Sequence, residues 1–97
     1  MAGILEIKEE TRVYRCVSFS TRKLSGVMFF WDKRFLLPRG YLIELSVPPI
    51  LMDQRVVLPF EFDDGAIMFI VFGELSPENQ KEVRQLFPLH STLFWIN

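Results

Sequence analysis

The first 72 residues contain short segments in which apolar and polar residues alternate, and two continuous apolar runs at residues 27–31 and 66–72, separated by segments rich in polar residues, Gly or Pro. A period of two with many β-branched and aromatic residues is typical of β-strands. The pattern predicts six strands, at residues 3–7, 12–20, 27–31, 41–47, 54–62 and 66–72. We expect the first two to form an antiparallel hairpin through the polar turn at residues 8–11.

Turn-forming residues refine this prediction. Asp, Lys and Arg at residues 32–34 predict a turn after the third strand. Pro59 predicts that the fifth strand lies at an edge, contains a bulge or breaks. Asp-Asp-Gly at residues 63–65 predicts a hairpin turn, because Asp tolerates and Gly favours a positive φ. The run at residues 66–72 is apolar on both faces, which predicts a central strand.

One helix is predicted after the strands, at residues 77–87. Ser76 provides a capping hydroxyl, Pro77 suits the first helical position, and Glu78 places an acid in the first turn. Residues 89–97 then form an apolar tail without charge. The pattern predicts a single domain over residues 1–97, mainly β, in which a small six-stranded antiparallel β-barrel carries one C-terminal helix.

Composition excludes several classes of protein. Hydrophobic residues make up 49% of the chain and charged residues 24%, which excludes intrinsic disorder. The net charge of −1 provides no positive field to attract nucleic acid or an anionic membrane. The N-terminus lacks the pattern of a signal peptide, and no segment predicts membrane insertion. We therefore expect a cytoplasmic protein.

The inventory of reactive residues predicts that the chain is not an enzyme and holds no metal or cofactor. Its single Cys and single His, Cys16 and His90, exclude an internal disulfide and a two-histidine metal site. A nucleophilic pair of Cys16 and His90 is conceivable, but Cys16 lies in an alternating apolar stretch where a buried thiol is common. The chain contains no GxGxxG, GxxxxGK[ST] or CxxC motif.

Three strings resemble the PilZ domain family. LPRGYLIELSVP at residues 37–48 resembles the family's turn and following strand, and SGVMFF at residues 25–30 resembles its Ser-x-x-Gly segment that leads into a strand. FIVFGELSPENQKEVRQLF at residues 69–87 is similar to the passage from the last strand into the helix. The resemblance covers nearly the whole chain and implies a PilZ-like β-barrel.

Typical PilZ domains bind cyclic di-GMP through an RxxxR pair and a [DN]xSxxG loop, and this chain departs from both motifs. Arg12 and Arg15 are spaced RxxR within a predicted strand, so their side chains are expected on opposite faces. In the loop motif only Ser25 remains, because Lys23 replaces the Asp or Asn and Met28 replaces the Gly. The departures imply little or no direct nucleotide binding.

The chain is most similar to the stand-alone PilZ proteins of bacterial type IV pilus biogenesis, which also lack the arginine pair. GILEI at residues 3–7, a second strand with Tyr14, and MFFWDKRFLLPRG at residues 28–40 carry this similarity. Such proteins act as adaptors that bind the pilus extension ATPase and, in some systems, an EAL-domain protein that senses cyclic di-GMP. The resemblance thus implies a non-catalytic adaptor in pilus assembly or motility signalling, as a monomer or weak homodimer.

Two sets of candidate site residues follow. Protein contacts are expected from aromatic residues in the strands and the tail, namely Tyr14, Phe29, Trp31, Phe94 and Trp95. The apolar tail must pack on its own barrel, pair with a second copy or dock on a partner, and the sequence leaves these alternatives open. The alternative function, a divergent cyclic di-GMP receptor, would use Arg12, Arg15, Arg22, Lys23 and Ser25.

Overall fold

A computed structural model describes residues 3–16, 30–52 and 54–88, and it leaves the side chains of residues 16 and 30–33 undescribed. Over these residues the chain is mainly β, with one α-helix after the strands. The strands are β1 (Gly3–Glu6), β2 (Thr11–Cys16), β3 (Phe30–Leu37), β4 (Leu42–Leu45), β5 (Ile50–Met52), β6 (Arg55–Glu61) and β7 (Ile67–Val71). A 3-10 turn, η1 (Phe72–Glu74), and the helix α1 (Pro77–Leu86) follow.

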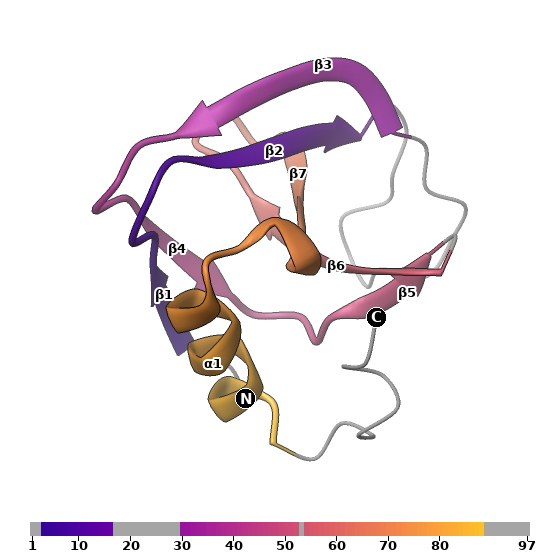
Figure 1. Ribbon diagram of the computed structural model, residues 1–97. Helices are drawn as coiled ribbons and strands as arrows, with labels where there is room; N and C mark the ends of the chain where they lie inside the picture. Colours follow the sequence, from indigo (N-terminus) through magenta and orange to yellow (C-terminus); the bar gives the residue numbers. More distant parts are fainter. Residues whose placement is uncertain (1–2, 17–29, 53, 89–97) are drawn as a thin grey trace.

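The strands form two antiparallel sheets rather than a closed six-stranded barrel. One sheet pairs β1 with β4, and the other has the order β3-β2-β7-β6-β5 (Figure 1). Among the described strands, backbone pairing links the members of each sheet but does not close a barrel. The prediction of six strands was wrong because β5 has three residues directly after two prolines, too few for a period of two to reveal.

The predicted hairpin between the first two strands was also wrong. Strand β1 pairs with β4, and β2 pairs with β3 and β7. The backbone beyond β1 continues toward β4, since the Ile7 amide donates to the Tyr41 carbonyl at 2.8 Å and the Gly40 amide donates to the Ile7 carbonyl at 2.6 Å. These bonds occupy the backbone groups that a tight hairpin would need.

Strand β3 passes through the predicted turn at residues 32–34. The β2–β3 ladder places Arg34 opposite Tyr14 and Leu37 opposite Thr11, with a register shift between Tyr14 and Cys16. The polar triplet is therefore part of a strand: Arg34 is paired with β2, and Asp32 and Lys33 lie in the register shift between the paired residues Phe30 and Arg34.

The central position of β7 and the turn before it confirm two predictions. Strand β7 lies between β2 and β6. In the turn, the Gly65 amide donates to the Phe62 carbonyl at 2.8 Å, Gly65 has a φ of 85°, and the Ala66 amide donates to Asp64 Oδ1 at 2.9 Å.

Pro59 does not interrupt β6, because β5 pairs only with Arg55–Val57 and requires no backbone donor at Pro59.

Two apolar clusters lie on opposite faces of the five-stranded sheet. The inner face contributes to the main core, in which Leu5, Val13, Leu58 and Ile70 are at most 1% exposed. The outer face holds a smaller cluster of buried residues, namely Val57, Phe69 and Val71. Strands β6 and β7 are consequently buried on both faces over most of their length.

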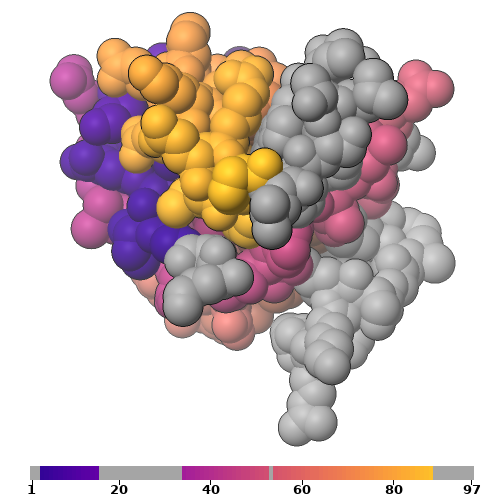
Figure 2. All heavy atoms as spheres, turned by 90° about the horizontal axis from the view of Figure 1, so that it is seen from below, coloured from indigo at the N-terminus to yellow at the C-terminus, as the bar shows by residue number. Residues whose placement is uncertain are grey.

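The helix begins as predicted and is attached to β1 by one buried amide. Ser76 Oγ accepts from the Asn79 amide at 3.2 Å. The fully buried Asn79 side chain donates to the Glu6 carbonyl at 2.6 Å and accepts from the Lys8 amide at 3.0 Å. The helix lies directly against β1 in Figure 2, and a Cβ on Gly3 would lie 2.8 Å from Leu86 Cδ2.

Candidate functional site

Strand β2 holds the predicted site residues whose side chains the structure describes, namely Arg12, Tyr14 and Arg15. Trp31 belongs to β3, but its side chain is not described. The remaining predicted residues lie outside the described part of the chain: Arg22, Lys23, Ser25, Phe29, Phe94 and Trp95. His90 also lies outside it, so the predicted roles of these residues remain predictions.

The two arginines of β2 lie on opposite faces of the sheet, as their spacing predicts. Arg15 is opposite Met68 in the β2–β7 ladder and therefore shares a face with the core residue Val13. Its guanidinium lies 3.4 Å from Asp64 Oδ2, in an ion pair exposed to solvent. Arg12 is exposed on the outer face, opposite Leu36. The pair therefore cannot clamp one ligand from one side of the strand.

Tyr14 is the centre of a mixed aromatic and charged surface on the outer face. Its hydroxyl donates to Glu74 Oε2 at 3.2 Å, and the Arg34 guanidinium lies over its ring, 5.2 Å from the centroid. Its ring packs against the outer apolar cluster. A cation over an aromatic ring is attracted by the ring quadrupole, so Arg34 and Glu74 hold the half-buried Tyr14 in one orientation.

The exposed Leu36 extends this surface. Leu36 follows Arg34 by two residues on β3, which places both on the same face, and it lies opposite Arg12 on β2. Its exposed fraction is 57%. We call this group the Tyr14 surface and define it as Arg12, Tyr14, Arg34, Leu36 and Glu74.

The sequence predicts site roles for Tyr14 and Arg12, places Arg34 only among the basic residues of a turn, and predicts no site role for Leu36 or Glu74. Arg34 lies in the predicted turn at residues 32–34, and Arg-Phe-Leu-Leu at residues 34–37 does not alternate in polarity, so the sequence pattern does not place Leu36 on the exposed face of a strand. Glu74 is 60 residues from Tyr14 in the sequence and belongs to η1. No local signal in the sequence predicts that contact.

A second polar site lies where the turn between β6 and β7 approaches β4. An open pocket of about 310 Å³ is lined by Glu44, Ser46, Glu61, Phe62, Asp63 and Gly65, and we call it the acidic pocket. Phe62 is stacked on Tyr41, with ring centroids 6.2 Å apart. Burial, and secondarily the negative charge of Asp63, raise the pKa of the Tyr41 hydroxyl above its ordinary value of 10.0.

Three polar side chains are buried in the described part of the chain, and each forms a hydrogen bond within the fold. They are Thr11, Ser76 and Asn79. Thr11 Oγ1 donates to the Glu9 carbonyl at 3.2 Å, whereas Ser76 and Asn79 form the helix cap and the link to β1. These groups therefore serve the fold.

The described residues contain no group of three or more His, Cys, Asp or Glu side chains placed to hold a metal ion. Within the same ranges, no helix has the length and apolar character needed to cross a membrane. Comparisons of the chain with protein-family models, with curated proteins and with solved structures gave no match. The residues and geometry of the two sites therefore carry the functional argument.

Proposed function

We propose that the protein is a non-catalytic adaptor that binds another protein through the Tyr14 surface. The observation that carries this proposal is the arrangement of Tyr14 between Arg34 and Glu74, beside the exposed Leu36. Tyr and Arg are enriched among the residues that dominate protein–protein affinity. A tyrosine already fixed in one orientation loses little conformational freedom on binding, which favours affinity.

The resemblance to the PilZ family supplies the finer form of the proposal. The chain would be a cytoplasmic, PilZ-like adaptor in bacterial type IV pilus assembly or cyclic di-GMP-linked motility signalling. Its partner would be a pilus extension ATPase or an EAL-domain protein. It would act without a cofactor, as a monomer or weak homodimer, and with little or no nucleotide binding of its own.

Binding of the purified chain to a purified pilus extension ATPase, and separately to an EAL-domain protein, tests the proposal by calorimetry. Because hot-spot truncations cost at least ~2 kcal/mol, we expect Tyr14→Ala to weaken binding more than about tenfold. Tyr14 also packs on the outer cluster, so the exposed Leu36→Ser serves as a second variant that leaves the fold intact.

The matched control is Leu51→Ser on β5, because Leu51 is 54% exposed and lies outside the Tyr14 surface. We expect Leu51→Ser to bind like the unaltered chain. Equal losses for Leu36→Ser and Leu51→Ser, or full binding by both Leu36→Ser and Tyr14→Ala, would contradict the assignment of this surface.

Titration with cyclic di-GMP separates the adaptor from the alternative, a divergent receptor. The opposite orientation of Arg12 and Arg15 favours the adaptor, because a guanidinium pair on one side is what grips a guanine and a phosphate together. Micromolar or tighter binding by the isolated chain would replace the adaptor proposal with the receptor. Arg22→Ala with Lys23→Ala, and separately Ser25→Ala, would then test the predicted loop.

A further inference from the structure

The outer face of the two-stranded sheet exposes two large aliphatic side chains between two carboxylates. Ile4 is opposite Glu44 and Leu42 is opposite Glu6 in the β1–β4 ladder. Ile4 is 58% exposed and Leu42 is 62% exposed, whereas Leu5, Ile43 and Leu45, which alternate with them, are buried. In the diagonal register, Ile4 and Leu42 are neighbours on one surface, which we call the Ile4–Leu42 face.

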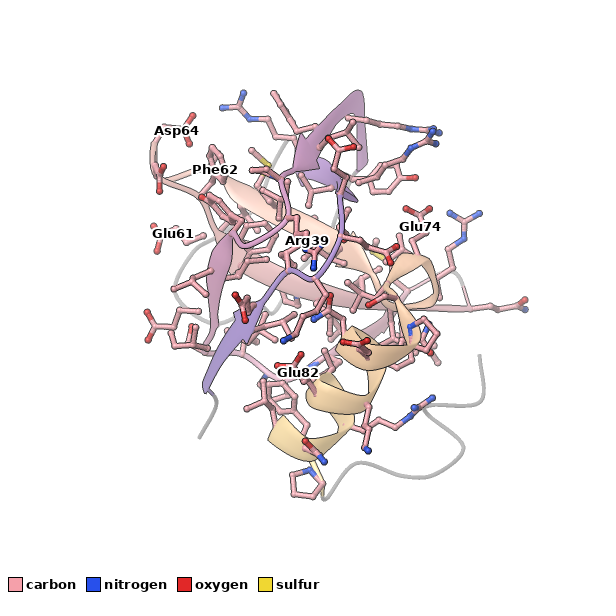
Figure 3. All side chains as sticks on the ribbon, turned by 60° about the vertical axis from the view of Figure 1, so that its left-hand side comes forward. Arg39, Glu61, Phe62, Asp64, Glu74 and Glu82 are labelled. Carbon is pink, nitrogen blue, oxygen red and sulfur yellow. The ribbon has the colours of Figure 1, made fainter. Side chains whose placement is uncertain are left out.

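The Ile4–Leu42 face is continuous with the acidic pocket. Glu44 belongs to both, because its side chain projects from the outer face of β4 and also lines the pocket. Ser46 continues the same side of the strand into the pocket. Figure 3 shows Glu61 and Phe62 together at one side of the molecule, away from Glu74 of the Tyr14 surface.

The pocket has an excess of negative charge. Glu44, Glu61 and Asp63 line it, and none of these carboxylates forms an ion pair within the described ranges. Two other carboxylates differ in this respect: Glu6, which is opposite Leu42, lies 3.4 Å from Lys8 Nζ, and Asp64, which follows Asp63, lies 3.4 Å from Arg15 Nη2. A cationic group entering the pocket would therefore meet three acceptors that no described cation neutralises.

We propose that this combined surface binds a segment of a partner protein that carries an arginine beside aliphatic residues. The arginine would enter the acidic pocket, and the aliphatic residues would cover Ile4 and Leu42. Arginine fits best because its planar guanidinium donates to several carboxylate oxygens at once and also packs on an aromatic ring such as Phe62. This surface shares no residue with the Tyr14 surface, so the inference stands independently of the function proposed above.

The probe is a short fluorescein-labelled peptide in which arginine and leucine alternate, titrated with the full chain by fluorescence anisotropy. We expect saturable binding that weakens as salt concentration rises, and no binding of the corresponding glutamate–leucine peptide. Amide chemical shifts of the labelled protein should change at β4 and at the turn between β6 and β7. Shift changes confined to other elements would overturn the proposal even if the peptide binds.

Charge-neutral variants test the pocket directly. With exposed ion pairs contributing ~0.5 kcal/mol each, we expect Glu44→Gln, Glu61→Gln and Asp63→Asn together to weaken peptide binding about tenfold. The matched control replaces Glu9, Glu10 and Glu78 with Gln, which removes the same charge from exposed positions outside the pocket. Equal weakening by both triple variants would show only general charge attraction and would overturn the proposal.

The aliphatic part of the surface has its own test. We expect Ile4→Ser with Leu42→Ser to weaken binding of the arginine–leucine peptide, and to leave unchanged the weaker binding of an arginine–serine peptide. Unchanged binding of the arginine–leucine peptide would remove the face from the site. Sedimentation of the chain alone tests the other occupant: a dimer that this double variant dissociates would assign the surface to a second copy and overturn the proposal.

Discussion

The two sheets use their outer faces differently. In β1 and β4 exposed and buried positions alternate, and the exposed positions include Ile4 and Leu42. In β6 and β7, by contrast, the outer positions Val57, Phe69 and Val71 are as well buried as the inner ones. Apolar residues on the outer face of β6 and β7 therefore stabilise the fold, whereas those on the outer face of β1 and β4, like Leu36 on the edge strand β3, remain available for contact.

This difference shows that hydrophobicity alone does not identify an interaction surface. Ile4 and Phe69 are both large apolar residues on outer faces, but Phe69 is 0% exposed whereas Ile4 is 58% exposed. An apolar side chain stabilises the fold in proportion to the surface area that it buries on folding, so truncating a buried side chain costs more stability than truncating an exposed one. We therefore expect truncation of Phe69 to lower the stability of the fold, and truncation of Ile4 to affect binding rather than stability.

The largest effect is expected for Phe69→Ala. Truncation of a fully buried Phe costs about 3–5 kcal/mol, because transfer energy is lost and a cavity remains. The measurement is the free energy of unfolding in urea, with Ile4→Ala as the matched variant on the other sheet. We expect the change at Ile4 to be about 0.5 kcal/mol or less, as for exposed positions in general. Similar losses at Ile4 and Phe69 would abolish the distinction between the two sheets.

A smaller loss is expected for Asn79→Ala, which removes the link between the helix and the two-stranded sheet. The Glu6 carbonyl and the Lys8 amide would both lose a partner, and each unsatisfied buried group costs about 1–3 kcal/mol. Some access of water to these partly buried groups leads us to expect about 2–4 kcal/mol in total. Urea denaturation provides the measurement.

Gln85→Ala on the exposed side of the same helix is the control for Asn79→Ala and should change the free energy of unfolding by less than about 0.5 kcal/mol. If Asn79→Ala is equally mild, the attachment of β1 depends on the apolar contacts of the helix instead. Val83, which is fully buried, would then be the next position to test.

The smallest effect concerns Tyr41, which connects the two sheets through its backbone bond to Ile7 and its ring contact with Phe62. Because the pKa of its hydroxyl is raised by burial and by Asp63, the folded protein retains the proton at a pH where the unfolded chain releases it. This stabilisation is complete below the ordinary pKa of 10.0 and is lost as pH rises through the folded value. The free energy of unfolding in urea, measured at pH values below and above 10, reports this loss of stability.

Tyr41→Phe should remove this part of the alkaline loss of stability, since Phe has no group to ionise. Asp63→Asn should reduce it less, because burial is the larger cause of the raised pKa. An alkaline loss in Tyr41→Phe as steep as that of the unaltered chain would assign it to other groups.

The sequence by itself determined the elements whose causes lie within a few consecutive residues. Ser76, Pro77 and Glu78 predicted the start of α1, and Asp-Asp-Gly at residues 63–65 predicted the turn before β7. The apolar run at residues 66–72 correctly predicted a central strand, because only a doubly covered strand tolerates such a pattern. The mainly β class with one helix after the strands followed from the same signals.

Only the tertiary structure decided which strands pair and which side chains meet. The pairing of β1 with β4 depends on residues about forty positions apart, and the extension of β3 through residues 32–34 depends on β2. The Tyr14–Glu74 contact and the acidic pocket likewise combine distant segments. Alternation shows that a strand has two different faces, but the partner that each face covers is selected by burial summed over the whole chain.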